Sequence, residues 1–152
     1  MQLLNLPTYQ FRIKRSKDQK EIFDSIRRKF VLLTPEEWVR QNIIRYLVEE
    51  KKFPETLIAV EKSLTLNKLK KRTDIVIYAS SGKPLLIVEC KAPEVKINQK
   101  VFEQIARYNL TLQVKYLMVS NGLEHYCSFI NFSKGEFTFI NEIPEYQELK
   151  NG

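Results

Sequence analysis

The sequence predicts one domain of the α/β (α+β) class, built on a mixed central sheet that is flanked by helices and extended by a C-terminal β-hairpin. Three observations predict this class. The chain has 152 residues, of which 43% are hydrophobic and 28% are charged, values typical of a single globular core. Short apolar runs of strand length alternate with longer amphipathic segments of helix length. No repeat and no low-complexity linker interrupts this order.

The predicted parts are an N-terminal helical extension (residues 1–33), a core (about 34–122) and a C-terminal hairpin (123–152). Within the extension, a helix over 17–29 would gather Ile22, Phe23 and Ile26 on one side. The core reads α-β-β-β-α-β. Its helices are expected at 34–51 and 98–112, its strands at 56–64, 74–78, 84–91 and 114–120, and the strands of the C-terminal hairpin at 126–132 and 136–140.

Three charged residues, Asp74, Glu89 and Lys91, lie on one predicted β-hairpin. If Ser81 and Gly82 form a two-residue loop, residue i pairs with residue 163 − i, which places Asp74 opposite Glu89. Directly opposed side chains have Cβ atoms roughly 5 Å apart, and Lys91 points to the same face as Glu89 because faces alternate along a strand. Two carboxylates at this spacing could share a divalent cation such as Mg²⁺, which also binds phosphate oxygens. The trio therefore suits phosphodiester chemistry.

The alternative is that these charges form ordinary cross-strand contacts on a surface hairpin. The strands that carry them read Ile-Val-Ile and Leu-Leu-Ile-Val, and such continuous apolar runs are typical of strands covered on both faces. Carboxylates in covered strands are costly unless they are paired or bound to a cation. The pattern therefore favours the functional interpretation.

The first core helix offers a third acid. Thr34 is a strong N-cap, Pro35 suits the first helical position, and Glu37 fits the reciprocal half of a capping box. Glu36 falls near the centre of the stripe formed by Val39, Ile43, Tyr46 and Leu47. We therefore favour Glu36 as a third metal-site acid, with Glu37 as runner-up; the alternative role of Glu36 is to face the helix dipole.

The net charge of +7, from 25 Lys and Arg against 18 Asp and Glu, favours a polyanionic partner. A basic cluster leads into the strand of Asp74 and is expected in a loop: Lys68, Lys70, Lys71 and Arg72. Beside a metal site such a cluster would hold a nucleic-acid backbone through its phosphates, although basic loops often only solvate a surface. On the second core helix, Gln104 and Tyr108 share a face four residues apart.

Several classes of protein are excluded or disfavoured. His125 is the only histidine, and Cys90 and Cys127 are the only cysteines, so neither a zinc site nor a disulfide framework is supported. No segment has the length of a membrane span or the pattern of a signal peptide, which favours a cytoplasmic protein. The phosphate-loop motif GxxxxGK[ST] is absent from the sequence, so no ATP-driven motor is predicted.

The ordered set Glu36, Asp74, Glu89-Cys90-Lys91 and Gln104-Ile-Ala-Arg-Tyr108 resembles the PD-(D/E)XK nuclease superfamily. Over roughly residues 20–122 it is similar in particular to the N-terminal nuclease domain of type I restriction endonuclease R subunits, with a QxxxY motif like that of RecB-type nucleases. The resemblance implies a restriction-endonuclease-like αβββαβ core. In one departure from the pattern, Thr73 rather than proline precedes Asp74.

The resemblance also implies a function, namely magnesium-dependent DNA endonuclease activity in restriction-modification. Asp74 and Glu89 would bind Mg²⁺ (Mn²⁺ as a substitute) with the backbone carbonyl of Cys90, and Glu36 would complete the acid cluster. Lys91 would orient the attacking water or stabilise the transition state. Gln104 and Tyr108 would assist, and other subunits would recognise the DNA target. Two alternatives stay open: a catalytically inactive nucleic-acid-binding module of the same fold, and a structural or toxin–antitoxin-like partner protein whose trio is only a salt-bridge network.

Overall fold

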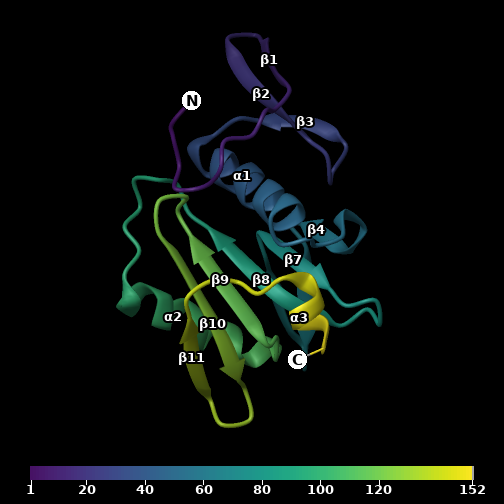
Figure 1. Ribbon diagram of the computed structural model, residues 1–152, viewed down its shortest axis with the longest axis vertical. Helices are drawn as coiled ribbons and strands as arrows, with labels where there is room; N and C mark the ends of the chain where they lie inside the picture. The colour runs from purple at the N-terminus through teal and green to yellow at the C-terminus, as the bar shows by residue number, and fades with distance from the viewer. Residues whose placement is uncertain (152) are drawn as a thin grey trace.

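The computed structural model describes residues 1–151 and the side chains up to residue 150. Its centre is a six-stranded sheet in the order β11-β10-β9-β8-β7-β4 (Figure 1). Strands β8 and β9 are parallel, whereas the other neighbours are antiparallel, so the predicted mixed sheet is confirmed. The strands are β4 (Ile58–Val60), β7 (Ile75–Tyr78), β8 (Pro84–Cys90), β9 (Tyr116–Ser120), β10 (His125–Asn131) and β11 (Glu136–Ile140).

Helices cover the two faces of this sheet, and the alternation along β8 shows which face is which. Leu86 and Val88 pack with helix α1 (Pro35–Glu49) in one apolar cluster. Ile87, between them, packs in a second cluster with helix α2 (Gln99–Asn109), which continues into the short 3₁₀ helix η2 (Leu110–Leu112). From Leu86 to Cys90, side chains of odd number therefore face α2, and those of even number face α1.

The N-terminal helical extension predicted for residues 1–33 is wrong. These residues instead form a three-stranded antiparallel meander of β1 (Ile13–Ser16), β2 (Gln19–Asp24) and β3 (Lys29–Leu32), which lies beside the start of α1 at one end of the molecule (Figure 1). Lys17 and Asp18 adopt positive φ angles of 50° and 66°, a turn that joins β1 to β2 and cannot continue a helix. Along β2, Ile22 and Asp24 are fully buried, a strand period.

Two further segments differ from the prediction. The strand expected at 56–64 is divided into the 3₁₀ helix η1 (Glu55–Leu57), β4, and β5 (Ser63–Leu66), because Glu61 adopts a φ of 54°. β5 pairs with β6 (Leu69–Arg72) in a separate hairpin, so most of the basic cluster lies in a strand rather than a loop.

The C-terminal part contains the expected β10–β11 hairpin and also a helix that the sequence did not predict, α3 (Tyr146–Asn151). Tyr146 and Leu149 of this helix are buried in the cluster around α1. The ring of Tyr146 meets that of Phe53 edge to face, with centroids 5.7 Å apart. Residues 123–151 therefore close one side of the core in addition to extending the sheet.

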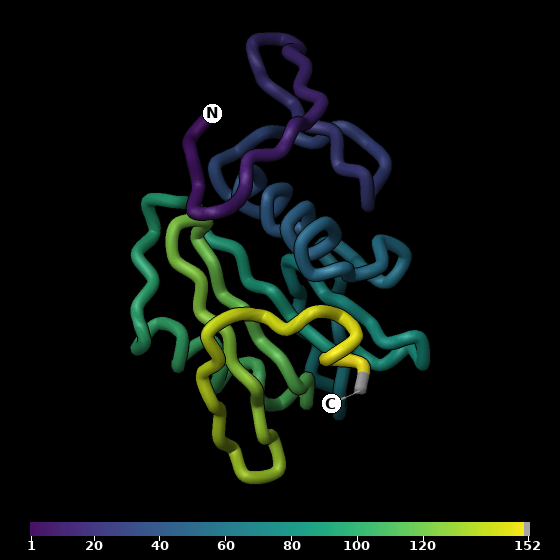
Figure 2. Tube along the Cα trace, viewed as in Figure 1, coloured from purple at the N-terminus to yellow at the C-terminus, as the bar shows by residue number. Residues whose placement is uncertain are grey.

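The N-terminal lead (residues 1–12) runs to the turn between β9 and β10 before it reaches the meander (Figure 2). The amide of Asn5 donates to the carbonyl of Gly122 at 2.8 Å, and His125 Nε2 lies 2.9 Å from the carbonyl of Asn5. His125 Nδ1 also lies 2.7 Å from Ser120 Oγ, so this histidine joins the N-terminal residues to the end of β9.

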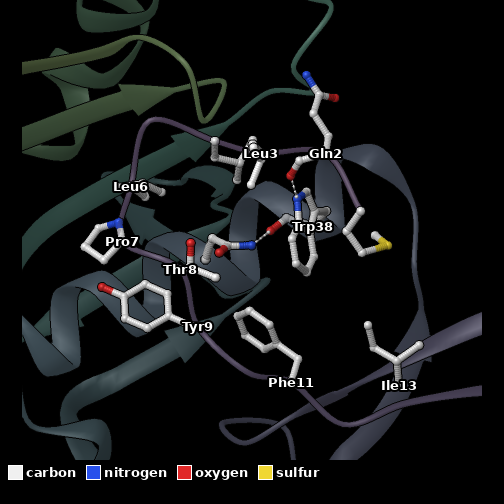
Figure 3. Close-up of a pocket in the computed structure, with 12 residues that line it drawn as sticks. Gln2, Leu3, Leu6, Pro7, Thr8, Tyr9, Phe11, Ile13 and Trp38 are labelled. Carbon is white, nitrogen blue, oxygen red and sulfur yellow. Dashed lines mark hydrogen bonds between the residues drawn. The ribbon is translucent and has the colours of Figure 1, made fainter.

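A pocket of about 270 Å³ separates the lead from α1 (Figure 3). Apolar side chains such as Leu6 and Phe11 line it, and Trp38 Nε1 closes one side by donating to the carbonyl of Gln2 at 2.8 Å. None of its lining residues belongs to the charged trio of the β7–β8 hairpin. Among the described residues, no helix is long and apolar enough to cross a membrane.

We expect Gly122→Ala to destabilise the fold more than Gly135→Ala. Both glycines have positive φ angles, 86° and 67°, so both variants share a similar backbone cost. A Cβ at Gly122 would lie 2.7 Å from Leu4 Cδ2, whereas nothing lies within 4 Å of a Cβ at Gly135. The extra overpacking should lower the free energy of unfolding by about 1–3 kcal/mol in urea titrations; equal losses for the two variants would contradict the packing of the lead.

Candidate active site

The β7–β8 hairpin has the predicted register, although its loop is longer than predicted. Ile75 pairs with Val88 and Ile77 with Leu86, which confirms pairing of residue i with residue 163 − i. The register then shifts after Ile77, and residues 79–83 form the turn, in which the Gly82 amide donates to the carbonyl of Ala79 at 2.9 Å. The two-residue loop is therefore wrong, but at the other end of the ladder the pairing brings Asp74 and Glu89 together.

Asp74 and Glu89, called the acid pair below, lie side by side just beyond the last pair of the ladder. Asp74 Oδ2 accepts a hydrogen bond of 2.7 Å from the amide of Cys90, which fixes its carboxylate beside Glu89. Burial raises the pKa of Glu89 to about 7, with further contributions from the charge of Asp74 and from a hydrogen bond to it. Such a raised pKa is the effect that a second close carboxylate has when no cation separates the two.

Glu36 and Glu37 have different surroundings although they are neighbours at the start of α1. Partial burial and the negative charge of Asp74 raise the pKa of Glu36, and the charge of Lys91 opposes this. Glu37 is buried and points instead to Arg27, whose Nη2 lies 2.9 Å from Glu37 Oε2. The reciprocal capping bond expected of Glu37 is wrong, because this ion pair engages its carboxylate; the Thr34 cap itself is confirmed by the bond from the Glu37 amide at 3.0 Å.

Lys91 extends the parallel pairing of β8 with β9, since its amide donates to the carbonyl of Ser120 at 2.8 Å. Its charge acts on both Glu89 and Glu36, so the ammonium lies near enough to influence both carboxylates. Cys90, between Glu89 and Lys91, is 1% exposed and packs in the apolar cluster of the opposite face.

The basic cluster is divided by the pleat of β6. Lys68 and Lys70 are exposed, and Arg72 Nη2 pairs with Glu61 Oε2 at 2.7 Å. Lys71 points inward and is only 6% exposed. Its Nζ lies over the ring of Tyr108, 2.7 Å from the centroid, and burial lowers its pKa to about 8 against the raising effect of Glu89.

Of the predicted pair on α2, Gln104 and Tyr108, only Tyr108 is connected to the acid pair. Tyr108 is 63% exposed and reaches the site through Lys71. Gln104 is exposed on the same helix, and among the described residues it makes no hydrogen bond to the acid pair.

One residue near the site was not found by reasoning from the sequence. Arg40 is buried, and its Nη1 donates to the carbonyl of Asp74 at 3.4 Å and lies 3.9 Å from Asp74 Oδ1. It therefore supports the acid pair from the side of α1. Its spacing of four residues from Glu36, on the same face of the helix, was a signal that could have found it.

The arrangement fits a magnesium site of two carboxylates rather than three. Within residues 1–151, no three His, Cys, Asp or Glu side chains are grouped closely enough to hold a metal ion. Magnesium, however, is usually held by one or two carboxylates together with water and substrate phosphate. The repulsion between the two carboxylates, which contributes to the raised pKa of Glu89, would make a cation favourable at this position because a cation neutralises it. Glu36 influences this position by its charge.

The element order α1-β4-β7-β8-α2-β9 around a mixed sheet, with an acid pair and a lysine at the end of the β7–β8 hairpin, defines a restriction-endonuclease-like nuclease domain. Residues 35–144 match the family described as type I restriction enzyme R protein N terminus. The chain belongs to this family, which agrees with the resemblance in its motifs.

Two solved structures are similar to this chain, and the first shows a similar fold. One is a fragment of a protein assigned as the HsdR subunit of a type I restriction enzyme from Vibrio vulnificus YJ016, with 19% identity and a TM-score of 0.54; the match covers 78% of this chain and 25% of that chain. The other, from Anabaena variabilis ATCC 29413, is assigned as a nuclease of family DUF820, with 10% identity, a TM-score of 0.48, and coverage of 91% and 88%. This chain thus spans about a quarter of the first. No curated protein matches it.

Proposed function

We propose that this domain is a magnesium-dependent endonuclease that hydrolyses phosphodiester bonds of DNA. The observation that carries the proposal is the acid pair: two carboxylates lie side by side at the end of the β7–β8 hairpin, with Asp74 fixed by the Cys90 amide, and burial and mutual repulsion raise the pKa of Glu89 beside two lysines. Such strongly perturbed groups are more common at functional sites than elsewhere. The family to which the chain belongs supports the same class of reaction.

Each residue of the site has a role in this proposal. Asp74, Glu89 and the backbone carbonyl of Cys90 would hold Mg²⁺ (or Mn²⁺). Bound there, the cation would lower the pKa of a water molecule and neutralise charge on the phosphate. Lys91 would donate to a phosphate oxygen as negative charge develops on it, and Glu36 would keep the Lys91 ammonium oriented through its charge. Arg40 would hold Asp74 in place from the side of α1.

DNA as the partner is supported by the excess of positive charge and by the exposed lysines of the β5–β6 hairpin. Lys68 and Lys70 lie on the solvent side of this hairpin, where they would contact backbone phosphates without reading the sequence. Recognition of a target would then come from other subunits, as the name of the family suggests for a restriction enzyme built from several chains.

Lys91→Met should slow nicking of supercoiled plasmid by about 100- to 1,000-fold, because it removes a cation that acts in the transition state. Wild-type protein should nick the plasmid with Mg²⁺ or Mn²⁺ and not with EDTA. Lys83→Met, in the exposed turn of the same hairpin, is the matched control and should cleave normally. Binding of the plasmid without cleavage in any metal would instead identify a catalytically inactive nucleic-acid-binding module.

A further inference from the structure

Lys71 is a buried cation that has no hydrogen-bond partner among the described residues. Its side chain enters the site from β6, between the exposed residues Lys70 and Arg72. Among the described residues, its Nζ is buried and has no hydrogen-bond partner, and it forms no ion pair. A buried ammonium without acceptors is costly and is rare in folded proteins. The buried position of the Lys71 ammonium therefore indicates a functional role.

The immediate surroundings of Lys71 provide only partial compensation. The negative charge of Glu89 acts on it from a distance, and the ring of Tyr108 faces its Nζ. A cation over an aromatic face is stabilised by a modest amount, less than the ammonium loses by leaving water. Tyr108 itself is 63% exposed, so the position lies next to the open surface of α2 and can be reached by a ligand.

The two lysines approach Glu89 from different elements, and the charges of both act on it. Lys91 follows β8 directly, whereas Lys71 comes from β6 and contacts Tyr108 of α2. A strand of nucleic acid whose scissile phosphate lies at the acid pair and Lys91 would therefore bring a neighbouring phosphate toward Lys71. Phosphate oxygens are the acceptors that the ammonium lacks.

We propose that Lys71, held by the ring of Tyr108, is a second phosphate-binding position, which takes a backbone phosphate next to the scissile one. This inference rests on the proposed nuclease function, and it assigns the QxxxY tyrosine a physical role. Tyr108 acts through the face of its ring rather than through its hydroxyl group. Lys71 binds substrate, and Tyr108 is a positioning residue.

The test is the salt dependence of binding to a short DNA duplex, measured by fluorescence anisotropy with Ca²⁺ in place of Mg²⁺. Lys71→Met should weaken binding about tenfold, the worth of one charge-assisted hydrogen bond, and should reduce the slope of log K against log salt by about 0.9. Lys134→Met, in the exposed turn between β10 and β11, should change neither. Tyr108→Ala should resemble Lys71→Met, and Tyr108→Phe, which keeps the ring, should restore binding.

Thermal unfolding without DNA separates this role from a structural one. A methionine at position 71 keeps the buried stem and removes the unpaired charge, so Lys71→Met should raise Tm by a few degrees. A lower Tm, or an unchanged salt slope, would overturn the inference. If the slope falls but no variant of the acid pair affects cleavage, the nuclease proposal fails instead, so the two failures can be distinguished.

Discussion

Glu89→Gln should reduce cleavage by about 1,000-fold or more and at the same time stabilise the metal-free protein. The loss of cleavage follows because a neutral amide replaces half of the acid pair. The gain in stability follows because burial and Asp74 raise the pKa of Glu89 to about 7, so its ionised form is unfavourable in the folded state. Opposite effects on activity and stability are typical of a residue retained for function.

The stability of the metal-free wild type should depend on pH through Glu89, and this dependence explains why Glu89→Gln should be the more stable protein. The pKa of Glu89 is higher in the folded protein than its ordinary value of 4.5, so the folded state binds the proton more tightly than the unfolded state. Its contribution to stability is complete below pH 4.5 and is lost as the pH rises through about 7. Glu89→Gln should lack this loss between the two values.

Urea titrations in EDTA at several pH values would measure this difference, with Glu136→Gln in the exposed part of β11 as the control. Addition of Mg²⁺ should stabilise the wild type by mass action and leave Glu89→Gln unchanged. A destabilised Glu89→Gln protein, or one that Mg²⁺ stabilises as well as it does the wild type, would show that the acid pair does not bind the cation.

The acid pair could be predicted from the sequence because the strand period fixes it. Once Ile75 and Val88 are placed opposite each other, the alternation of faces determines where Asp74, Glu89 and Lys91 point. The extra residues of the turn did not disturb this, because the register shifts only after Ile77. The alternation of side chains along two paired strands was therefore sufficient to predict that Asp74 and Glu89 lie together.

The sequence could not predict the surroundings of the acid pair in the same way. Ile22, Phe23 and Ile26 are spaced as on a helix, but Lys17 and Asp18 both adopt positive φ angles, which are uncommon for residues other than glycine and especially for lysine. The inward direction of Lys71 depends on a similar turn at Asn67 and Lys68. Tertiary packing decides both, and neither leaves a pattern in the local sequence.

Arg27→Met should lower the free energy of unfolding by about 3–5 kcal/mol, the usual result of removing one partner from a buried ion pair. Arg27 Nε lies 2.6 Å from Asp24 Oδ2, and its Nη2 lies 2.9 Å from Glu37 Oε2. Both carboxylates are buried, so the variant leaves Asp24 without its cation and leaves Glu37 with Arg40 alone. Arg28→Met, at the exposed next residue, is the matched control and should cost much less.

Acid unfolding provides an independent measurement of the same contact. Burial alone would raise the pKa of Asp24, but hydrogen bonds and charge from Arg27 lower it below 3.8. The stability from this shift is present above that value and is lost as the pH falls through the lowered pKa. In Arg27→Met the pKa of Asp24 should rise, so acid unfolding should begin at a higher pH than in the wild type or in Arg28→Met.

The effect of this variant should also reach the active site, although Arg27 precedes the residues 35–144 that match the family. Arg27 holds Glu37, Glu37 lies 3.2 Å from Arg40 Nε, and Arg40 donates to the carbonyl of Asp74. Cleavage by Arg27→Met should therefore fall even at temperatures where the variant is folded. Full activity of the folded variant would show that the meander stabilises the start of α1 without positioning the acid pair.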